Sequence, residues 1–188
     1  MSSSNNFTPS YLITGGAGFI GSTLAETIIK KGVGQVTVLD NLSTGRIENL
    51  QSVLKQIQFI EGDIRNQNIV SKATKNMNYI LHCAAISSVK DAFENPDLTN
   101  DVNINGTLRL LQNCENEKIT RFVFSSTAAI YGLPEKIPIK EDCIPDLLSI
   151  YAVSKVAGEH LCSMFQKNYG LKTTILRYFN VFGPKQDQ

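Results

Sequence analysis

The sequence alternates short apolar segments, rich in β-branched and aromatic residues, with longer stretches of helical pattern. The apolar segments predict six strands, at Tyr11–Ile13, Val36–Leu39, Gln58–Ile60, Tyr79–Leu81, Phe122–Phe124 and Thr174–Leu176. The stretches between them predict helices at about Gly18–Lys31, Asn66–Thr74, Asp101–Asn116 and Ser149–Asn168. Strands that alternate with helices favour parallel pairing through right-handed crossovers. We therefore predict an α/β fold built on a doubly wound parallel sheet.

Length and composition fit a single domain. The chain has 188 residues, with 18 basic against 17 acidic side chains. We expect residues 1–10 to form a flexible tail, residues 11–188 to form the domain, and the proline-containing stretch 133–148 to be a loop. Nucleic-acid binding is not expected because the chain has no basic surplus. No apolar run approaches the roughly 18 residues of a membrane span, and the N-terminus does not have the pattern of a secretory signal.

Cysteine and histidine spacing argues against a metal site. The four cysteines, Cys83, Cys114, Cys143 and Cys162, form no CxxC pair, and the two histidines have no metal-ligand spacing. We expect no bound metal, reduced thiols and a cytoplasmic location.

A glycine-rich segment follows the first predicted strand and opens the first predicted helix. Gly15, Gly18 and Gly21 have the spacing GxxGxxG. Such glycines permit a tight strand-to-helix turn, close approach of a pyrophosphate and close packing of helix on strand. The helix N-terminus then offers unpaired N–H groups to the phosphates. An ordinary tight turn has the same pattern, so the glycines alone leave both interpretations open.

Asp40 favours the dinucleotide interpretation, a Rossmann-type domain. It ends the second predicted strand, roughly 20 residues beyond the glycines, where an acid holds a ribose 2′-OH. A carboxylate there repels a 2′-phosphate, and the next residue is Asn41, so NAD is favoured over NADP. Arg46 is near enough to leave NADP as the alternative. Asp63 is a further candidate on the adenine side, with a turn or N-cap aspartate as its structural alternative.

Tyr151 and Lys155 form a YxxxK pair one helical turn apart, so both project from one face of the last predicted helix. A free phenol has a pKa near 10, and a nearby ammonium together with the positive nicotinamide ring of bound NAD⁺ can lower it towards the range of a general base. Ser125, Ser126 and Thr127 end the fifth predicted strand, at the sheet edge where such folds bind ligands. One of these hydroxyls can share a hydrogen bond with a substrate oxygen and Tyr151. For Ser125 we prefer a structural role.

The motifs occur together in a fixed order. They are TGGAGFIGS at Thr14–Ser22, DNLSTG at Asp40–Gly45, Asp63–Ile64, HCAA at His82–Ala85, NINGT at Asn103–Thr107, SSTAAIYG at Ser125–Gly132, Tyr151 with Lys155, and RYFNVFGP at Arg177–Pro184. The set closely resembles the extended short-chain dehydrogenase/reductase family, in particular its NAD-dependent nucleotide-sugar epimerases of the UDP-glucose and UDP-N-acetylglucosamine 4-epimerase type. The resemblance extends from Tyr11 to Pro184.

The resemblance implies roles for individual residues. Tyr151 would be the general base, Lys155 would orient the NAD ribose and lower the tyrosine pKa, and Thr127 would bind the sugar O4. The NAD site would be formed by Gly15, Gly18, Phe19, Ile20, Gly21, Asp40, Asn41, Ser43, Thr44, Asp63, Ile64, Ala84, Ala85, Ser87, Val102, Asn103, Tyr151, Lys155 and Phe179. Substrate would contact Ser87, Ser126, Thr127, Tyr151 and Asn180.

The implied reaction is epimerisation at C4 of a UDP-hexose or UDP-N-acetylhexosamine through a transient 4-keto sugar. The related 4,6-dehydratases usually follow the threonine with an Asp-Glu pair, whereas this chain has Ala128 and Ala129. Methyl groups cannot transfer protons, so epimerisation is favoured over dehydration. A decarboxylase or reductase stays open.

The resemblance also bears on assembly and on the activity of the chain alone. Family members continue past the equivalent of residue 188 with a C-terminal substrate domain that we expect to be absent here. We therefore expect NAD binding with little or no turnover, and a non-catalytic NAD-binding module is the alternative. The family commonly forms homodimers through the helices matching Asp101–Asn116 and Ser149–Asn168. Leu108, Leu111, Val156 and Met164 are candidates for that interface or for the core.

Overall fold

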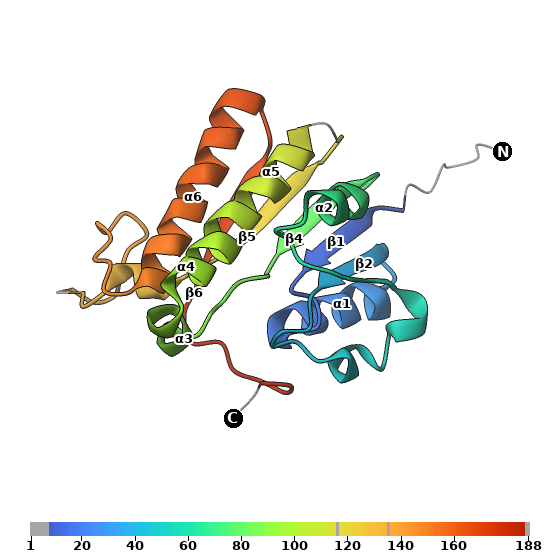
Figure 1. Ribbon diagram of the computed structural model, residues 1–188, viewed down its shortest axis with the longest axis horizontal. Coiled ribbons are helices and arrows are strands. Elements are labelled where there is room, and N and C mark those ends of the chain that lie inside the picture. Colours follow the sequence, from blue (N-terminus) through green and yellow to red (C-terminus); the bar gives the residue numbers. More distant parts are fainter. Residues whose placement is uncertain (1–7, 116, 135, 187–188) are drawn as a thin grey trace.

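The computed structural model describes residues 8–115, 117–134 and 136–186, and its centre is a six-stranded parallel sheet (Figure 1). The strands are β1 (Ser10–Thr14), β2 (Gln35–Asp40), β3 (Gln58–Glu61), β4 (Tyr79–His82), β5 (Arg121–Thr127) and β6 (Thr173–Tyr178). Their order in the sheet is β3-β2-β1-β4-β5-β6, so β1 pairs with both β2 and β4. The order reverses between β1 and β4, which is where doubly wound sheets bind ligands. The predicted fold class and all six predicted strands are confirmed.

Side-chain alternation along the strands creates a core on each face of the sheet. Leu12 packs in one hydrophobic cluster and its neighbour Ile13 in the other, as expected for residues that point to opposite faces. Helices α2 (Gln67–Thr74), α5 (Thr107–Glu115) and α6 (Ile150–Tyr169) cover the face that contains Leu12. Helix α1 (Phe19–Lys31) and two 3₁₀ turns, Ile47–Leu50 and Leu54–Gln56, cover the other.

The long helices begin and end where their terminal residues dictate. The Ser149 hydroxyl accepts a hydrogen bond from Ala152 N at 3.1 Å and caps α6, and Gly170, with φ of 71°, ends it. Asn66 caps α2 by accepting from Asn68 N and Ile69 N. Helix α1 begins after Gly18, which provides no side-chain cap, so the first N–H groups of this helix have no side-chain acceptor at its N-cap.

The segment before α5 differs from the prediction. A helix was expected over Asp101–Asn116, but residues Asp101–Gly106 form a π-helix and α5 itself starts at Thr107. Residue 116 lies outside the described residues. Two short helices, α3 (Val89–Glu94) and α4 (Pro96–Asn100), were not predicted. Their signals were present: Ser88 caps α3 by accepting from Asp91 N, and Pro96 occupies the start of α4.

The remaining regions agree with the predicted outline. Strand β1 begins at Ser10, inside the predicted tail, and residues 1–7 lie outside the described residues. Between residues 133 and 148 the described residues form neither helix nor strand. All four cysteines are free thiols. Within the part of the chain that the structure describes, no helix has both the length and the apolar character needed to cross a membrane.

Candidate functional site

The turn between β1 and α1 requires two of the three motif glycines. Gly15 has a φ of 67°, and a Cβ there would lie 2.6 Å from Ala84 N on the adjacent strand connection. A Cβ at Gly21 would collide with the carbonyl oxygen of Gly15. The turn is therefore tightly folded against both α1 and the end of β4. Its glycines leave the α1 N-terminus accessible at the switch point of the sheet, and no acidic residue lies in the first turn of α1.

Asp40 fixes the geometry of this turn. Its two carboxylate oxygens accept hydrogen bonds from Ala17 N and Leu42 N, both at 2.9 Å, and the residue is only 8% exposed. The carboxylate thus joins the glycine-rich turn to the end of β2. Asn49 supports the same turn from the other side, because its amide nitrogen donates to the Ala17 carbonyl oxygen at 2.8 Å.

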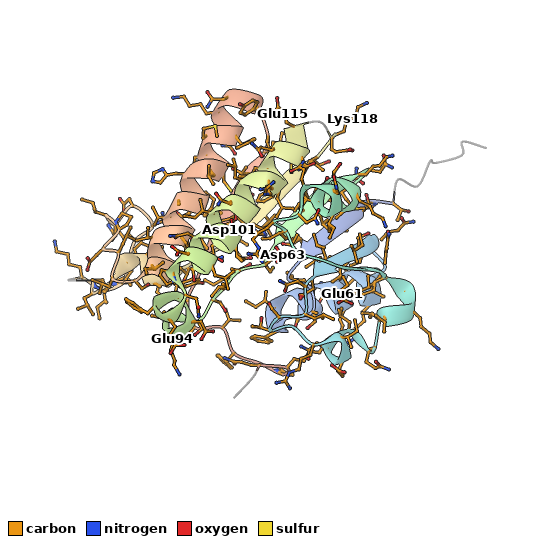
Figure 2. All side chains as sticks on the ribbon, in the orientation of Figure 1. Glu61, Asp63, Glu94, Asp101, Glu115 and Lys118 are labelled. Carbon is orange, nitrogen blue, oxygen red and sulfur yellow. The ribbon has the colours of Figure 1, made fainter. Side chains whose placement is uncertain are left out.

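Asp63 belongs to an ion-pair network rather than standing alone. Arg65 donates to both of its carboxylate oxygens, at 3.0 and 2.8 Å, and also to Asp101 at 3.1 Å. Figure 2 labels Asp63 and Asp101 close together at the centre of the view. Hydrogen bonds from Arg65 hold the pKa of Asp63 below its usual value. Asp63 also accepts from Arg65 N at 2.8 Å, so it has the predicted turn role while facing the cleft.

Lys155 is a buried cation at the floor of the site. It is 4% exposed, and its Nζ donates to the Ser125 carbonyl oxygen at 2.8 Å and lies 5.0 Å from the centre of the Phe124 ring. Burial lowers the pKa of Lys155 to about 8. Its Nζ lies 5.8 Å from the centre of the Tyr151 ring.

The groups around Tyr151 act on its pKa in opposite directions. Burial raises the pKa of Tyr151 above its usual value, and a hydrogen bond with the Thr127 side chain opposes the rise. The joint effect of Lys155 and bound NAD⁺ on this pKa stays a prediction, because the protein groups alone leave the pKa raised. The Lys155 ammonium is directed to the Ser125 carbonyl oxygen, and burial outweighs the hydrogen bond from Thr127.

Two buried polar side chains support the cleft from behind. His82 lies between the hydroxyls of Thr14 and Thr107, at 2.7 and 2.8 Å, and burial lowers its pKa to about 3, so it is neutral. Asn103 accepts from Ile86 N at 2.8 Å and donates to Ile86 O at 3.0 Å. Asn103 thus holds the Ala84–Ser87 segment in place without lining the cleft itself.

These groups surround one cleft of about 990 Å³ along the carboxyl ends of the strands. Every other predicted NAD-site residue lines it, together with Thr127 and Asn180. Ser126 also borders the cleft, but its hydroxyl donates to Glu159 at 2.5 Å. This bond uses the hydroxyl proton, and the substrate contact of Ser126 stays a prediction. Within the described residues, no group of three His, Cys, Asp or Glu side chains is arranged to hold a metal ion.

The cleft also has residues that sequence reasoning missed. Outside the predicted motifs these include Asn49, Arg65, Lys185 and Gln186. The predicted motifs also contribute lining residues to which no NAD or substrate contact was assigned, among them Gly45, Cys83, Ala129, Tyr178, Val181 and Phe182. Arg65 directly follows the Asp63–Ile64 motif in the sequence, so its proximity could have been inferred. Lys185 gave no local signal, because its contacts lie more than 130 residues away in sequence.

Comparison with known proteins identifies the class to which this fold and cleft belong. The profile of the NAD dependent epimerase/dehydratase family matches residues 11–188, and the chain belongs to this family. A putative UDP-glucose 4-epimerase of Methanocaldococcus jannaschii is 36% identical over 178 residues, which are 94% of this chain and 57% of that protein.

Solved structures show the same likeness. UDP-glucose 4-epimerase of Thermus thermophilus, in complex with NAD, is 43% identical, with a TM-score of 0.88 over 95% of this chain and 57% of that one. A dTDP-glucose 4,6-dehydratase of Streptomyces venezuelae with NAD bound is 31% identical, with a TM-score of 0.90 over 94% of this chain and 57% of that one. The chain thus spans little more than half the length of these relatives, and the fold alone does not distinguish epimerase from dehydratase.

Proposed function

We propose that this chain forms the NAD-binding and proton-transfer part of a UDP-sugar 4-epimerase. The observation that carries the proposal is the placement of Tyr151, Thr127 and Lys155 on the same cleft as the glycine turn and Asp40. A dinucleotide site and an acid–base group are thereby joined in one cavity. That combination is what removal and return of a hydride and a proton at one carbon requires.

The described residues fit NAD. The glycine turn leaves no Cβ where a pyrophosphate would approach, and the first turn of α1 has neither an acidic residue nor a side-chain cap to compete with phosphate. Asp40 and Asp63 would hold the adenosine end, and Lys155 the nicotinamide ribose. Bound NAD supplies the acceptor for the sugar C4 hydride and a positive ring charge near Tyr151.

Proton transfer is assigned to Tyr151. Because burial raises the pKa of this phenol, we propose that it becomes a base only when positive charge is added to the cleft. The Thr127 hydroxyl would donate to the phenolate and share the sugar O4. Tyr151 would take the O4 proton as the C4 hydride leaves and return it after the 4-keto sugar has rotated.

Dehydration is the less favoured alternative. Thr127 is followed by Ala128 and Ala129 in a 3₁₀ turn, and Ala129 lines the cleft. Neither methyl group can act as acid or base, so water elimination at a neighbouring carbon lacks its proton donor. Ala128 and Ala129 do not argue against a reductase or a decarboxylase, which are further alternatives.

Low turnover is expected from the 188-residue chain by itself. The cleft is open to solvent beside two of its aromatic lining residues: Phe179 is 59% exposed and Phe182 is 86% exposed. An open site neither excludes water nor orients a hexose. A non-catalytic NAD-binding module is therefore the second candidate, and we propose UDP-glucose and UDP-N-acetylglucosamine as the substrates to test.

The test combines NAD titration with an assay of the reaction on added UDP-sugar. The chain, mixed with NAD and excess UDP-glucose or UDP-N-acetylglucosamine, is followed by the absorbance of reduced nicotinamide and by product chromatography. From the wild type we expect a slow rise in the absorbance of reduced nicotinamide and a trace of the C4 epimer. From Tyr151→Phe we expect neither. Tyr169→Phe, at the far end of α6 and 52% exposed, is the control. Failure to bind NAD contradicts the proposal, and NAD binding with no reaction in any variant favours the binding module.

A homodimer in the cytoplasm completes the proposal. Helices α5 and α6 run side by side (Figure 1), and Val153 and Met164 of α6 are 45% and 36% exposed. Leu111, one of the candidates for the interface, is instead fully buried. Four free thiols suit a reducing compartment. Light scattering tests the assembly, and a monomer across the accessible concentration range would contradict the dimer.

A further inference from the structure

The chain segment after β6 crosses the cleft from one half of the sheet to the other. Residues 179–186, called the strap below, leave β6 and run to the side of α1 (Figure 1). Phe179, Asn180, Val181, Phe182, Lys185 and Gln186 of the strap all line the cleft. The strap therefore forms part of the wall of the cleft in which the proposed dinucleotide would bind.

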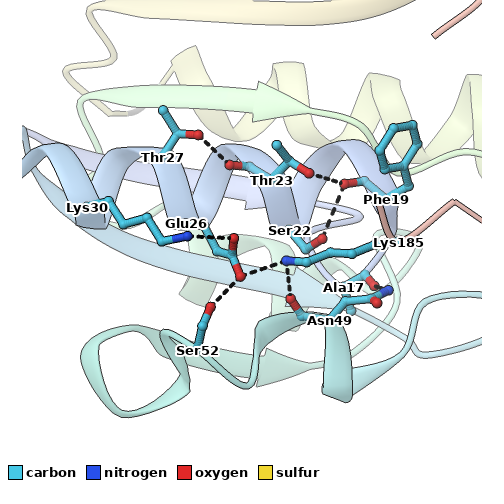
Figure 3. A network of polar contacts seen from close by, with 10 residues as sticks. All are labelled: Ala17, Phe19, Ser22, Thr23, Glu26, Thr27, Lys30, Asn49, Ser52 and Lys185. Atoms are coloured by element: carbon cyan, nitrogen blue, oxygen red, sulfur yellow. Dashed lines mark hydrogen bonds and ion pairs between the residues drawn. The ribbon is translucent and has the colours of Figure 1, made fainter. Parts of the chain in front are cut away.

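Lys185 anchors the far end of the strap. Its Nζ lies 2.7 Å from Glu26 Oε1 on α1 and donates to the Asn49 carbonyl oxygen, also at 2.7 Å (Figure 3). The Lys185 side chain is 24% exposed and that of Glu26 is 17% exposed, so the pair is largely shielded from solvent. Glu26 further accepts from Lys30 at 3.2 Å and from Ser52. The hydrogen bond from Lys185 is the main reason why the pKa of Glu26 falls to about 2.

The backbone of the strap is adapted to this anchor. Lys185 has a φ of 73°, which a residue with a Cβ adopts only at a cost that its surroundings must offset. Two residues earlier, Gly183 packs against the Phe19 ring, where a Cβ would lie 3.2 Å from the ring edge. Phe19 is the first residue of α1 and lines the cleft. The anchor thus sets the strap against the helix end proposed to bind the pyrophosphate.

Asn49 connects the anchor to the glycine turn. Its carbonyl oxygen accepts from Lys185, while its side-chain amide donates to the Ala17 carbonyl oxygen at 2.8 Å. Ala17 N in turn donates to Asp40. One asparagine therefore contacts the strap through its backbone and the turn through its side chain.

We propose that Lys185 is a positioning residue for the cofactor: its bonds to Glu26 and Asn49 hold the strap across the cleft and slow the release of NAD. The inference rests on the proposed NAD binding. Loss of the anchor frees the strap end while leaving the glycine turn, Asp40 and Lys155 in place. The effect is expected mainly on the dissociation rate, because a bound ligand must wait for the strap to move.

The experiment measures NAD release and strap opening separately. Stopped-flow displacement of NAD from the 188-residue chain gives the dissociation rate, and hydrogen exchange of the amides of residues 179–186 without NAD reports strap opening. For Lys185→Ala we expect release about tenfold faster, a smaller change in the association rate and faster exchange in the strap. Lys185→Arg, which keeps the charge and the donors, is expected to restore slow release.

Lys30→Ala is the matched control. Lys30 also bonds to Glu26, but through the other carboxylate oxygen, and its side chain is 66% exposed. This variant should release NAD at the wild-type rate. Faster strap exchange in Lys185→Ala with unchanged NAD release would overturn the inference, as would equal effects of Lys30→Ala and Lys185→Ala. A wild-type chain that binds no NAD overturns the proposed function, and this inference with it, whatever the exchange data show.

Discussion

The Lys155 ammonium lies 2.8 Å from the Ser125 carbonyl oxygen and forms no ion pair with a carboxylate of the described residues. A buried cation held by a carbonyl dipole and an aromatic face costs folding free energy, since burial lowers its pKa to about 8. A position that destabilises the fold yet lines the cleft is typical of a functional site.

Replacement of Lys155 by methionine should therefore stabilise the chain and abolish tight NAD binding. Below pH 8 the lysine is charged in both folded and unfolded chains, and a pKa of about 8 against 10.5 implies a penalty of about 3 kcal/mol. Because the Ser125 carbonyl loses its donor, we expect a net gain of about 2 kcal/mol at pH 7. Urea unfolding measures this gain in the free energy of unfolding, and NAD titration measures the loss of binding.

The pH dependence of that gain is a second part of the same test. Between pH 8 and 10.5 the unfolded lysine still holds its proton and the folded one has lost it, so wild-type stability rises with pH. The difference between Lys155→Met and wild type should shrink over this interval. A methionine variant that is less stable than wild type at pH 7 would contradict the prediction.

His82 should make the fold sensitive to mild acid. Its folded pKa of about 3 lies below the unfolded value of 6.5, so its contribution is fully present above pH 6.5 and is lost as the pH falls towards 3. Between pH 6.5 and 5 the loss is about 2 kcal/mol. Asp63 and Asp101, whose pKa values are lowered, add to the loss only nearer pH 4.

Urea midpoints at four values between pH 7.5 and 5 measure this loss. His82→Gln, which can still bond to Thr14 and Thr107, should be less stable at pH 7.5 but should lose less between pH 6.5 and 5. His160→Gln is the control, because His160 is exposed on α6. An identical slope in wild type and His82→Gln would show that another group titrates in this interval.

Much of this architecture could be predicted because local signals and global fold agree. Strand positions follow from β-branched runs such as Val36–Leu39, and the ends of α6 follow from Ser149 and Gly170. The glycine turn and Asp40 could be placed together because parallel strands present their carboxyl ends at one edge. Short helices such as Val89–Glu94 have too few residues for a period to emerge.

The rest of the site depends on contacts between distant residues. The Ser126 hydroxyl, for which the resemblance implies a substrate contact, donates to Glu159, which lies one turn beyond Lys155 on α6. Lys185 was not singled out, because its partner Glu26 lies 159 residues away. Neither pairing has a local sequence signature, so only the folded chain reveals it.

Glu159 should contribute to the stability of the fold through its contacts at the sheet edge near Thr127. Its carboxylate accepts from Ser126, and from Arg177 at 3.0 and 2.7 Å, while Arg177 also donates to Tyr131 at 2.8 Å. Glu159→Ala leaves a guanidinium that is only 24% exposed without its carboxylate, and we expect a loss of about 2 kcal/mol in urea unfolding. Glu159→Gln keeps an acceptor and should lose less; equal losses would show that charge alone matters.

Asp40 should set the choice between NAD and NADP. Its carboxylate lines the cleft at the end of β2, and a charge there repels a 2′-phosphate. Asp40→Asn removes the charge, so we expect NAD to bind about tenfold more weakly. NADP should lose less affinity than NAD, because removal of the charge also removes the repulsion of its 2′-phosphate, and the ratio of the two dissociation constants therefore narrows. Some of the NAD loss will come from the turn, because the amide retains only one oxygen for Ala17 N and Leu42 N. That loss affects both cofactors equally, so the ratio of the two dissociation constants isolates the effect of the charge.

Titration of NAD and of NADP into the wild type and into Asp40→Asn measures this ratio. A ratio that stays at the wild-type value would mean that another group, with Arg46 the first to examine, sets cofactor choice.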